Sequence, residues 1–242
     1  MPKVSVLMPV YNTKEEYLRE SIESILKQTF TDFEFIIIND GSTNNAKDVI
    51  LSYQDSRIKY YEQENQGIAA TLNRGLDLSQ GEYIARMDAD DISMPERLKK
   101  QTEFLDVHSD ISVLGSWCEF FPKQKVMKYI AEPKYLDFIK FCQICHPAVM
   151  LRSNILKQYN LKYNSKYKCE DYELWSRAIK FVKFYNIPEV LLKYRWHENN
   201  ISKISEKFSD DVEKVKQNML DFLTNNEMLK YICKHKYSIY AY

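Results

Sequence analysis

The sequence predicts an α/β fold in which a mostly parallel β-sheet is flanked by helices. Short apolar runs rich in β-branched residues alternate with segments whose apolar residues recur at helical spacing. The run over residues 33–39 is continuously apolar, as in a parallel strand covered on both faces. The chain has 242 residues, of which 45% are hydrophobic and 28% charged, enough for one substantial globular domain. These observations favour a doubly wound βαβ arrangement.

The strands and helices of the first half are expected in regular alternation. Residues 4–10 form an apolar, β-branched strand with Pro9 near its end. A helix over 14–27 places its apolar residues on one face, and the second strand ends in the turn signal Asn39-Asp40-Gly41-Ser42. The elements expected next are a helix over 46–52, a strand over 58–62, a helix over 68–78, a strand over 83–87 and a helix from Pro95 to about residue 108. Beyond Phe121-Pro122 the pattern becomes irregular, which indicates an α+β half.

Three carboxylates follow the strand over 83–87 within four residues. Asp88, Asp90 and Asp91 carry like charges that repel at this spacing, so a fold that crowds them is expected to offer them a cation. Oxygen ligands favour a hard ion, and Mg²⁺ or Mn²⁺ keeps coordination positions open for substrate phosphates. The alternative is a solvated acidic turn before the next helix.

Polar residues gather where the parallel strands end. Tyr11, Asp40 and the acidic stretch 88–91 each follow a predicted strand, and ligands of such sheets bind outside the carboxyl ends of the strands. The chain has only five glycines, at positions 41, 67, 75, 81 and 115, so it contains neither a Gly-x-Gly-x-x-Gly turn nor a Walker phosphate loop. A nicotinamide dehydrogenase and a P-loop enzyme are therefore disfavoured.

The charge balance differs between the two halves. Residues 1–120 contain 12 Lys and Arg against 21 Asp and Glu, and residues 121–242 contain 22 against 13, so the halves carry −9 and +9. The basic half suits an anionic partner such as a lipid pyrophosphate or a membrane surface, although solvated lysines are the default explanation. We expect no nucleic-acid partner.

The cysteines and the hydropathy pattern indicate a location. The five cysteines are odd in number and scattered, which favours reduced thiols, and the Cys142-x-x-Cys145 pair lacks the further ligands of a zinc site. No run approaches the roughly 18 to 20 apolar residues of a membrane span. We expect a cytoplasmic protein, with the inner face of the membrane as the alternative location.

Several sequence blocks, in this order, resemble the inverting family-2 glycosyltransferases with the GT-A fold, a Rossmann-like architecture. The blocks are Val6-Leu7-Met8-Pro9-Val10-Tyr11-Asn12, Ile37-Ile38-Asn39-Asp40-Gly41-Ser42, Gly67-Ile68-Ala69-Ala70, Asn73-Arg74-Gly75, Gly81-Glu82-Tyr83-Ile84-Ala85-Arg86-Met87-Asp88-Ala89-Asp90-Asp91 and Pro95-Glu96-Arg97. The likeness covers about residues 3–200 and is strongest to bacterial enzymes that assemble exopolysaccharide, capsule or lipopolysaccharide. The chain departs from the family at Asn39, commonly Asp, and at Leu72, where many members carry an arginine for which Arg86 or Arg74 is expected to compensate.

The resemblance implies a nucleotide diphosphate sugar donor, most often a UDP-sugar, and a divalent ion, Mn²⁺ or Mg²⁺. Tyr11 would lie against the base and Asp40 would accept its ring N–H, unless Asp40 only caps its turn. Asp88 would hold the ribose side, and Asp90 of the DXD motif would bind the metal. The full set of residues implied to bind the donor is Pro9, Val10, Tyr11, Asn12, Asp40, Ala69, Asn73, Arg86, Asp88 and Ala89.

The resemblance also implies the catalytic groups of the second half. Asp171 would be the general base that takes the proton of the acceptor hydroxyl, with Glu170 as its supporting neighbour. Carboxylates also favour helix starts for purely structural reasons. His146 and Trp175 are assigned to the acceptor side, although His146 equally suits a core position and Trp175 belongs to an apolar helical face.

His197 follows a strand expected over 190–197, and we predict that it is a second metal ligand or a phosphate contact, assisted by Arg195 or Lys203. A surface loop histidine is the alternative. The expected organisation is one GT-A domain over 1–204, with a nucleotide-sugar-binding half over 1–120 and an acceptor-side half over 121–204. A helical extension over 205–242 would pack on the core, mediate self-association or lie on a membrane surface.

The main hypothesis is a metal-dependent inverting glycosyltransferase of the hexosyltransferase type. It would transfer a sugar to a saccharide or lipid-linked saccharide acceptor. A sugar-1-phosphate nucleotidyltransferase is disfavoured, because residues 9–14 lack the glycine-rich basic loop that such an enzyme needs after the first strand. A non-catalytic nucleotide-binding scaffold is the remaining alternative.

Overall fold

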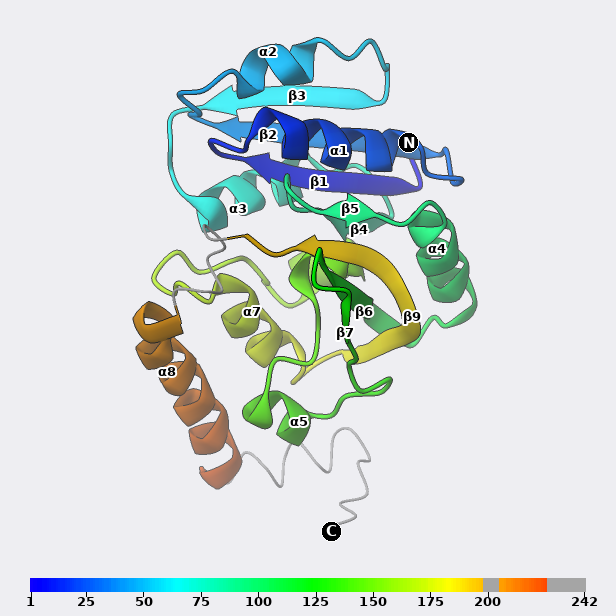
Figure 1. Cartoon of the computed structure of the whole chain (residues 1–242). Helices are drawn as coiled ribbons and strands as arrows, with labels where there is room; N and C mark the ends of the chain where they lie inside the picture. Colours follow the sequence, from blue (N-terminus) through cyan, green and yellow to red (C-terminus); the bar gives the residue numbers. More distant parts are fainter. Residues whose placement is uncertain (198–204, 226–242) are drawn as a thin grey trace.

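The computed structural model describes residues 1–197 and 205–225, and the side chains of residues 205–209 lie outside that description. Figure 1 shows an upper layer built by the first half of the chain and a lower one built by the second half. The elements of the first half are β1 (Val4–Val10), α1 (Glu15–Leu26), β2 (Phe33–Asp40), α2 (Ala46–Leu51), β3 (Ile58–Gln63), α3 (Ile68–Leu78), β4 (Tyr83–Arg86), β5 (Ile92–Ser93) and α4 (Arg97–Val107). The remaining described elements are β6 (Ile111–Phe121), β7 (Lys125–Met127), α5 (Tyr135–Lys140), a 3₁₀ turn η1 (His146–Ala148), β8 (Met150–Arg152), α6 (Asn154–Gln158), α7 (Glu170–Ala178), β9 (Lys183–Arg195) and α8 (Ser205–Thr224).

The described strands form one nine-stranded sheet in the order β3-β2-β1-β4-β8-β6-β9-β5, with β7 paired to β6. The pairings β3–β2, β2–β1 and β1–β4 are parallel, as the alternation of the first half predicts. The second half mixes the parallel pair β6–β9 with antiparallel pairings of β8, β7 and β5. The sheet is therefore parallel where β1, β2 and β4 end together and mixed elsewhere.

The core lies on both faces of this sheet. Strands β1 and β2 are buried along their whole length, which explains why most of their residues are apolar on both faces. One cluster joins alternate residues of these strands to the buried face of α1. The other joins the opposite faces to α3, α7 and α8, with the fully buried Trp175 among its members. Burial on both faces fixes the register of the strands, and the register determines the position of the residue at the carboxyl end of each strand.

Several expected elements differ from those observed. Pro95 does not open α4, which starts at Arg97, because residues 92–93 first form β5 against β9. In the irregular second half, residues 146–148 form a 3₁₀ turn, and the short β8 follows it. The sequence interpretation missed β6, whose partners β8 and β9 lie far along the chain, and β7, which pairs with β6. Since β6 spans residues 111–121 and pairs with β9, the two halves share one sheet.

The C-terminal extension begins as a helix on the core. Val215 and Met219 of α8 are buried, and the hydroxyl of Tyr135 in α5 donates to the backbone carbonyl of Met219 at 3.2 Å. This contact supports intramolecular packing for the first part of the extension. The roles considered for residues 226–242, and the contribution of Lys203, concern residues outside the described part of the chain. No helix in the described part is both long and apolar enough to cross a membrane.

Candidate active site

The site begins where β1 ends. Tyr11 follows the last residue of the strand and is 54% exposed, so its ring is open to a ligand. Asn12 has a φ of 49°, a left-handed conformation that asparagine tolerates. Its side-chain oxygen accepts from the backbone N–H of Thr43 at 2.8 Å, and its own N–H donates to Ser42 Oγ at 3.0 Å. Asn12 therefore ties the loop after β1 to the loop after β2.

Asp40, the last residue of β2, is buried and has three partners. One of its oxygens accepts from Gln63 Nε2 at 2.7 Å and from the N–H of Gln66 at 2.9 Å, and the other accepts from the N–H of Gly67 at 2.9 Å. The carboxylate thus holds the loop that precedes α3. This role differs from a cap of its own turn, where Asn39 Oδ1 accepts from the N–H of Ser42 at 3.0 Å, and it leaves about one of four acceptor positions of Asp40 for a base N–H.

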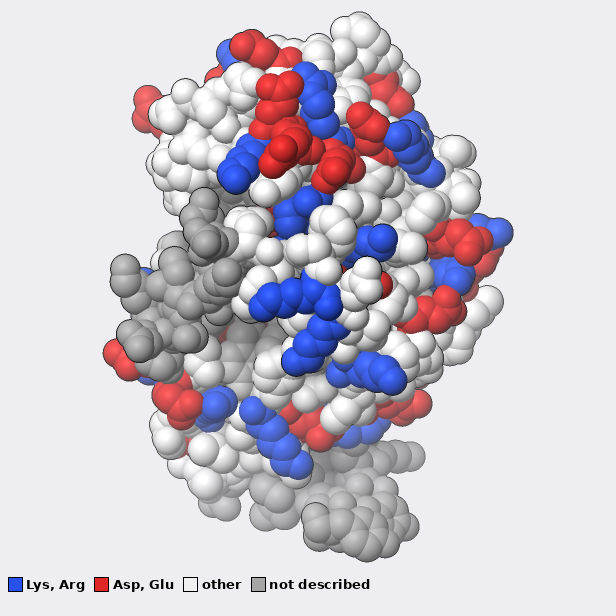
Figure 2. Space-filling view, in the orientation of Figure 1, with Lys and Arg blue, Asp and Glu red and all other residues white. Residues whose placement is uncertain are grey.

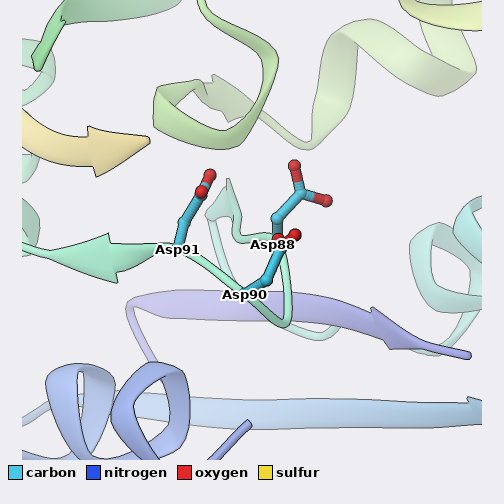
Figure 3. Close-up of side chains that lie close together, drawn as sticks. All are labelled: Asp88, Asp90 and Asp91. Atoms are coloured by element: carbon cyan, nitrogen blue, oxygen red, sulfur yellow. The ribbon is translucent and has the colours of Figure 1, made fainter. Parts of the chain in front are cut away.

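Three carboxylates converge after β4. Figure 3 shows Asp88, Asp90 and Asp91 on the connection between β4 and β5. One oxygen of each lies within 4.8 Å of the others. Asp91 is 1% exposed, and its Oδ2 is buried without a hydrogen-bond partner in the described structure. Crowded oxygen ligands with an unsatisfied buried carboxylate atom fit a divalent cation such as Mg²⁺ or Mn²⁺.

The electrostatics of this cluster reflect the crowding. Burial raises the pKa of Asp91 well above its ordinary value, and the charges of Asp88 and Asp90 raise it further. Burial also raises the pKa of Asp90, followed by the charge of Asp88, whereas His197 lowers it. A cation at this point would relieve both the desolvation and the repulsion.

Arg86 is the buried cation beside this cluster. It is 5% exposed, and its Nη1 forms an ion pair with Asp88. Burial acts to lower the pKa of Arg86, but the adjacent Asp88 outweighs it and the pKa is raised. Its Nε and Nη1 have no hydrogen-bond acceptor of good geometry in the described structure. Arg74, the other arginine considered near the phosphates, donates to the carbonyl of Glu62 and to Gln63 Oε1, both at 2.9 Å.

The end of β9 closes over the acidic cluster. His197 Nε2 lies 2.8 Å from Asp90 Oδ2, so the structure brings together the two residues predicted to bind the metal. The Arg195 N–H donates to Asp91 Oδ1 at 2.8 Å, and its Nε donates to the carbonyl of Asp90 at 2.7 Å. Arg195 thereby holds the conformation of the acidic stretch rather than facing a ligand.

Helix α1 supports this arrangement with two side chains. The ring of Tyr17 lies 4.3 Å from the Arg195 guanidinium carbon and stacks on His197 with ring centroids 5.7 Å apart. Glu20 forms an ion pair with Arg195. Sequence reasoning missed both residues, because they belong to a helical face with no chemical signature of its own.

The second carboxylate pair begins α7. Glu170 and Asp171 are half-buried at the N-terminus of this helix, where Asp171 Oδ1 accepts from the N–H of Tyr172 at 2.7 Å. Burial raises the pKa of Glu170 to about 8, with the charge of Asp171 as the next cause. Burial also raises the pKa of Asp171, while the Tyr172 N–H and the charge of Arg86 lower it. The charge of Asp88 raises the pKa of both Glu170 and Asp171, and the charge of Arg86 lowers both. The pair and the triad therefore interact electrostatically.

The two predicted acceptor-side residues lie in the core instead. Trp175 is 1% exposed, and His146 is 7% exposed and packs edge-on against it with ring centroids 6.0 Å apart. His146 Nε2 lies 2.8 Å from the hydroxyl of Tyr163, and burial lowers the pKa of His146 well below its ordinary value. The expectation that they form an acceptor surface is therefore wrong: apolar neighbours enclose Trp175, and burial keeps His146 neutral.

Among the predicted donor residues, Asn73 has a structural partner. Its Nδ2 donates to the carbonyl of Tyr163 at 2.9 Å, and its Oδ1 accepts from the N–H of Tyr163 at 2.8 Å. Asn73 thus fastens α3 to the segment that leads to α7, which indicates a role in shaping the site. The remaining small residues of the predicted set are buried beneath the strand ends: Pro9, Val10, Ala69 and Ala89.

The comparisons with known proteins agree with this geometry. The family model described as glycosyl transferase family 2 matches residues 5–180. The chain belongs to glycosyl transferase family 2. An uncharacterized glycosyltransferase of Methanocaldococcus jannaschii is 41% identical over 221 residues, which cover 85% of this chain and 76% of the relative. The O-antigen biosynthesis glycosyltransferase WbnJ of Escherichia coli is 33% identical over 214 residues, which cover 83% of this chain and 82% of WbnJ.

Solved structures show the same fold. S. aureus TarS in complex with UDP-GlcNAc superposes with a TM-score of 0.78 at 21% identity, over 90% of this chain and 66% of TarS. The mannosyltransferase PcManGT of Pyrobaculum calidifontis, in complex with GDP-Man and Mn²⁺, gives 0.68 at 15% identity, over 87% and 63%. The chain thus spans about two thirds of the length of these proteins. At such identities the likeness shows the fold, which is the GT-A fold expected for family 2.

Proposed function

We propose that this family-2 chain is a metal-dependent inverting glycosyltransferase of the hexosyltransferase type. It would move one sugar from a nucleotide diphosphate sugar, with a UDP-sugar as the first candidate, to a saccharide or lipid-linked saccharide. The observation that carries the proposal is the meeting of two carboxylate groups around Arg86. The triad at 88–91 follows β4, and the pair Glu170 and Asp171 begins α7.

The donor side of the proposal rests on the residues at the ends of β1, β2 and β4. The exposed ring of Tyr11 offers a stacking surface for a base, and Asp40 holds the loop that precedes α3. Asp90, with His197, would hold the divalent ion, and Asp88 would hold the ribose side of the donor. When bound, this ion would stabilise the negative charge that develops on the leaving diphosphate.

On the acceptor side, Asp171 would accept the proton of the attacking hydroxyl. The oxygen of this acceptor hydroxyl then bonds to the anomeric carbon while the bond to the diphosphate breaks on the opposite side, which inverts the configuration. A base works best when its pKa approaches the working pH, and burial raises the pKa of Asp171 in that direction. Glu170, with a pKa of about 8, can hold a proton beside it and so limit the local negative charge.

The relatives suggest the biological setting. WbnJ is described as an O-antigen biosynthesis enzyme, so we propose a role in the synthesis of a bacterial surface glycan. The four cysteines of the described chain are free thiols, namely Cys118, Cys142, Cys145 and Cys169. Reduced thiols are typical of the cytoplasm, and we place the reaction there.

The test is calorimetric titration of UDP, with GDP and dTDP as comparisons, in the presence and absence of Mn²⁺. The proposal predicts metal-dependent binding that is selective for UDP and is abolished by Asp90→Ala. Selective binding of GDP would support a glycosyltransferase whose donor is a GDP-sugar, such as the GDP-Man bound to PcManGT. If the folded protein binds no nucleotide, the donor site is refuted and the scaffold alternative gains support.

A further inference from the structure

One surface in the second half of the chain has no role in the proposed sugar transfer. The segment over residues 123–141 contains β7, α5 and their connections. It exposes lysines and large apolar side chains together, and we call it the basic–apolar surface. Apart from Lys134, which pairs with Glu132, its exposed lysines are Lys123, Lys125, Lys128 and Lys140, and its exposed large apolar residues are Val126, Ile130, Leu136 and Phe141.

The lysines of this surface have few acidic neighbours. Lys123 Nζ lies 4.8 Å from the ring centroid of Trp196, and Lys128 Nζ lies 5.1 Å from that of Trp117. Within the described residues, none of the four forms an ion pair, whereas Lys134 pairs with Glu132 at 3.3 Å. Figure 2 shows basic side chains gathered over the part of this face that contains β7 and α5, and acidic ones over α1. The segment over residues 123–141 carries five Lys against two Asp and Glu, a net charge of +3.

The large apolar residues of this surface are exposed, whereas neighbouring apolar residues of the same segment are buried in the core. In α5, Tyr135 and Phe138 are buried, while Leu136 is 58% exposed. Leu136 and Lys140 lie four residues apart, on the same outer face of this helix. Phe141 is 52% exposed, and its ring stacks on Tyr129 with centroids 6.5 Å apart. Val126 and Ile130 are 39% and 45% exposed.

We propose that the basic–apolar surface docks this protein on an anionic lipid bilayer. Lysine stems, aromatic rings and exposed aliphatic side chains are the residues that enter the interfacial zone of a membrane, and the lysine charges meet the anionic head groups. An acidic protein partner would form ion pairs with the lysines, but it would offer the exposed aliphatic side chains no apolar environment. The surface also borders the candidate active site, because Trp196 beneath Lys123 precedes the predicted metal ligand His197.

The experiment is co-sedimentation of the full chain with vesicles made of equal parts phosphatidylglycerol and phosphatidylcholine. We expect binding that weakens as salt rises, and little binding to phosphatidylcholine alone. The triple variant Lys123→Glu, Lys125→Glu, Lys128→Glu should bind at least about 100-fold more weakly, since each surface lysine contributes about fivefold. The double variant Leu136→Ser, Phe141→Ser should lose about tenfold at unchanged charge.

The matched control is Lys59→Glu, Lys99→Glu, Lys157→Glu, which makes the same charge change at exposed lysines of β3, α4 and α6. We expect it to retain most of the binding. Equal losses in both triple variants would show a general charge effect and overturn the proposal, as would a wild-type chain that stays in the supernatant. Circular dichroism and UDP titration of each variant separate loss of folding or of the donor site from loss of membrane binding.

Discussion

The crowding of Asp88, Asp90 and Asp91 predicts an unusual response to the substitution Asp90→Asn. Two unit charges 4.8 Å apart repel by about 3.5 kcal/mol at an effective dielectric constant of about 20. The charge of Asp88 repels an ionised Asp90, and Arg86 and His197 offset this repulsion in part. Asparagine keeps the shape of the side chain and an acceptor for His197, but it removes the charge. We therefore expect the metal-free variant to be more stable than the wild type by about 1–2 kcal/mol.

The assay is urea unfolding at neutral pH, in EDTA and in saturating Mn²⁺. A ligand present at about 100 times its Kd stabilises the folded state by about 2.7 kcal/mol, and the wild type should gain on this order. The variant has lost the predicted metal ligand and should gain nothing measurable. The variant would then be more stable than the wild type in EDTA and less stable than the wild type in Mn²⁺.

The control for this prediction is Asp110→Asn, which neutralises an exposed carboxylate paired with Lys183 at 2.8 Å. We expect its free energy of unfolding to change by less than about 1 kcal/mol in either buffer. The reasoning is refuted if Asp90→Asn destabilises the metal-free protein, or if the variant gains as much from Mn²⁺ as the wild type does.

Three further predictions concern the residues around the base. Asp171→Asn should lower kcat by a factor of about 10²–10⁴ and leave UDP binding unchanged in calorimetry; normal turnover would exclude Asp171 as the base. Glu170 has a pKa of about 8 in the fold against 4.5 ordinarily, so the folded state holds a proton that the unfolded chain releases between these values. The metal-free protein should therefore lose on the order of 2 kcal/mol of stability as pH rises through this window, and Glu170→Gln should flatten that slope in a urea series. Asn73→Ala removes two hydrogen bonds to the backbone of Tyr163 and should cost about 1–3 kcal/mol of stability with UDP affinity retained; reduced UDP affinity at full stability would return Asn73 to the donor site.

The first half of the fold could be predicted because its signals are local. Strands β1 and β2 are buried on both faces, so their predominantly apolar runs identify them directly. The turn after β2 and the acidic stretch after β4 then fall at the carboxyl ends of parallel strands, and such ends share one edge of the sheet. The acidic triad could be predicted for the same reason, as could the proximity of the loops after β1 and β2, which Asn12 joins.

The α/β class, the positions of the parallel strands and the two carboxylate groups could be predicted from the sequence, because the signal for each lies in adjacent residues. Which distant groups meet these carboxylates depends on how the chain folds in three dimensions. The mixed sheet brings β9 back to β5, so Arg195 and His197 reach Asp90 from more than 100 residues away. It also buries His146 and Trp175 between packed elements. Burial depends on contacts among segments remote in sequence, which a local pattern of residue types does not contain.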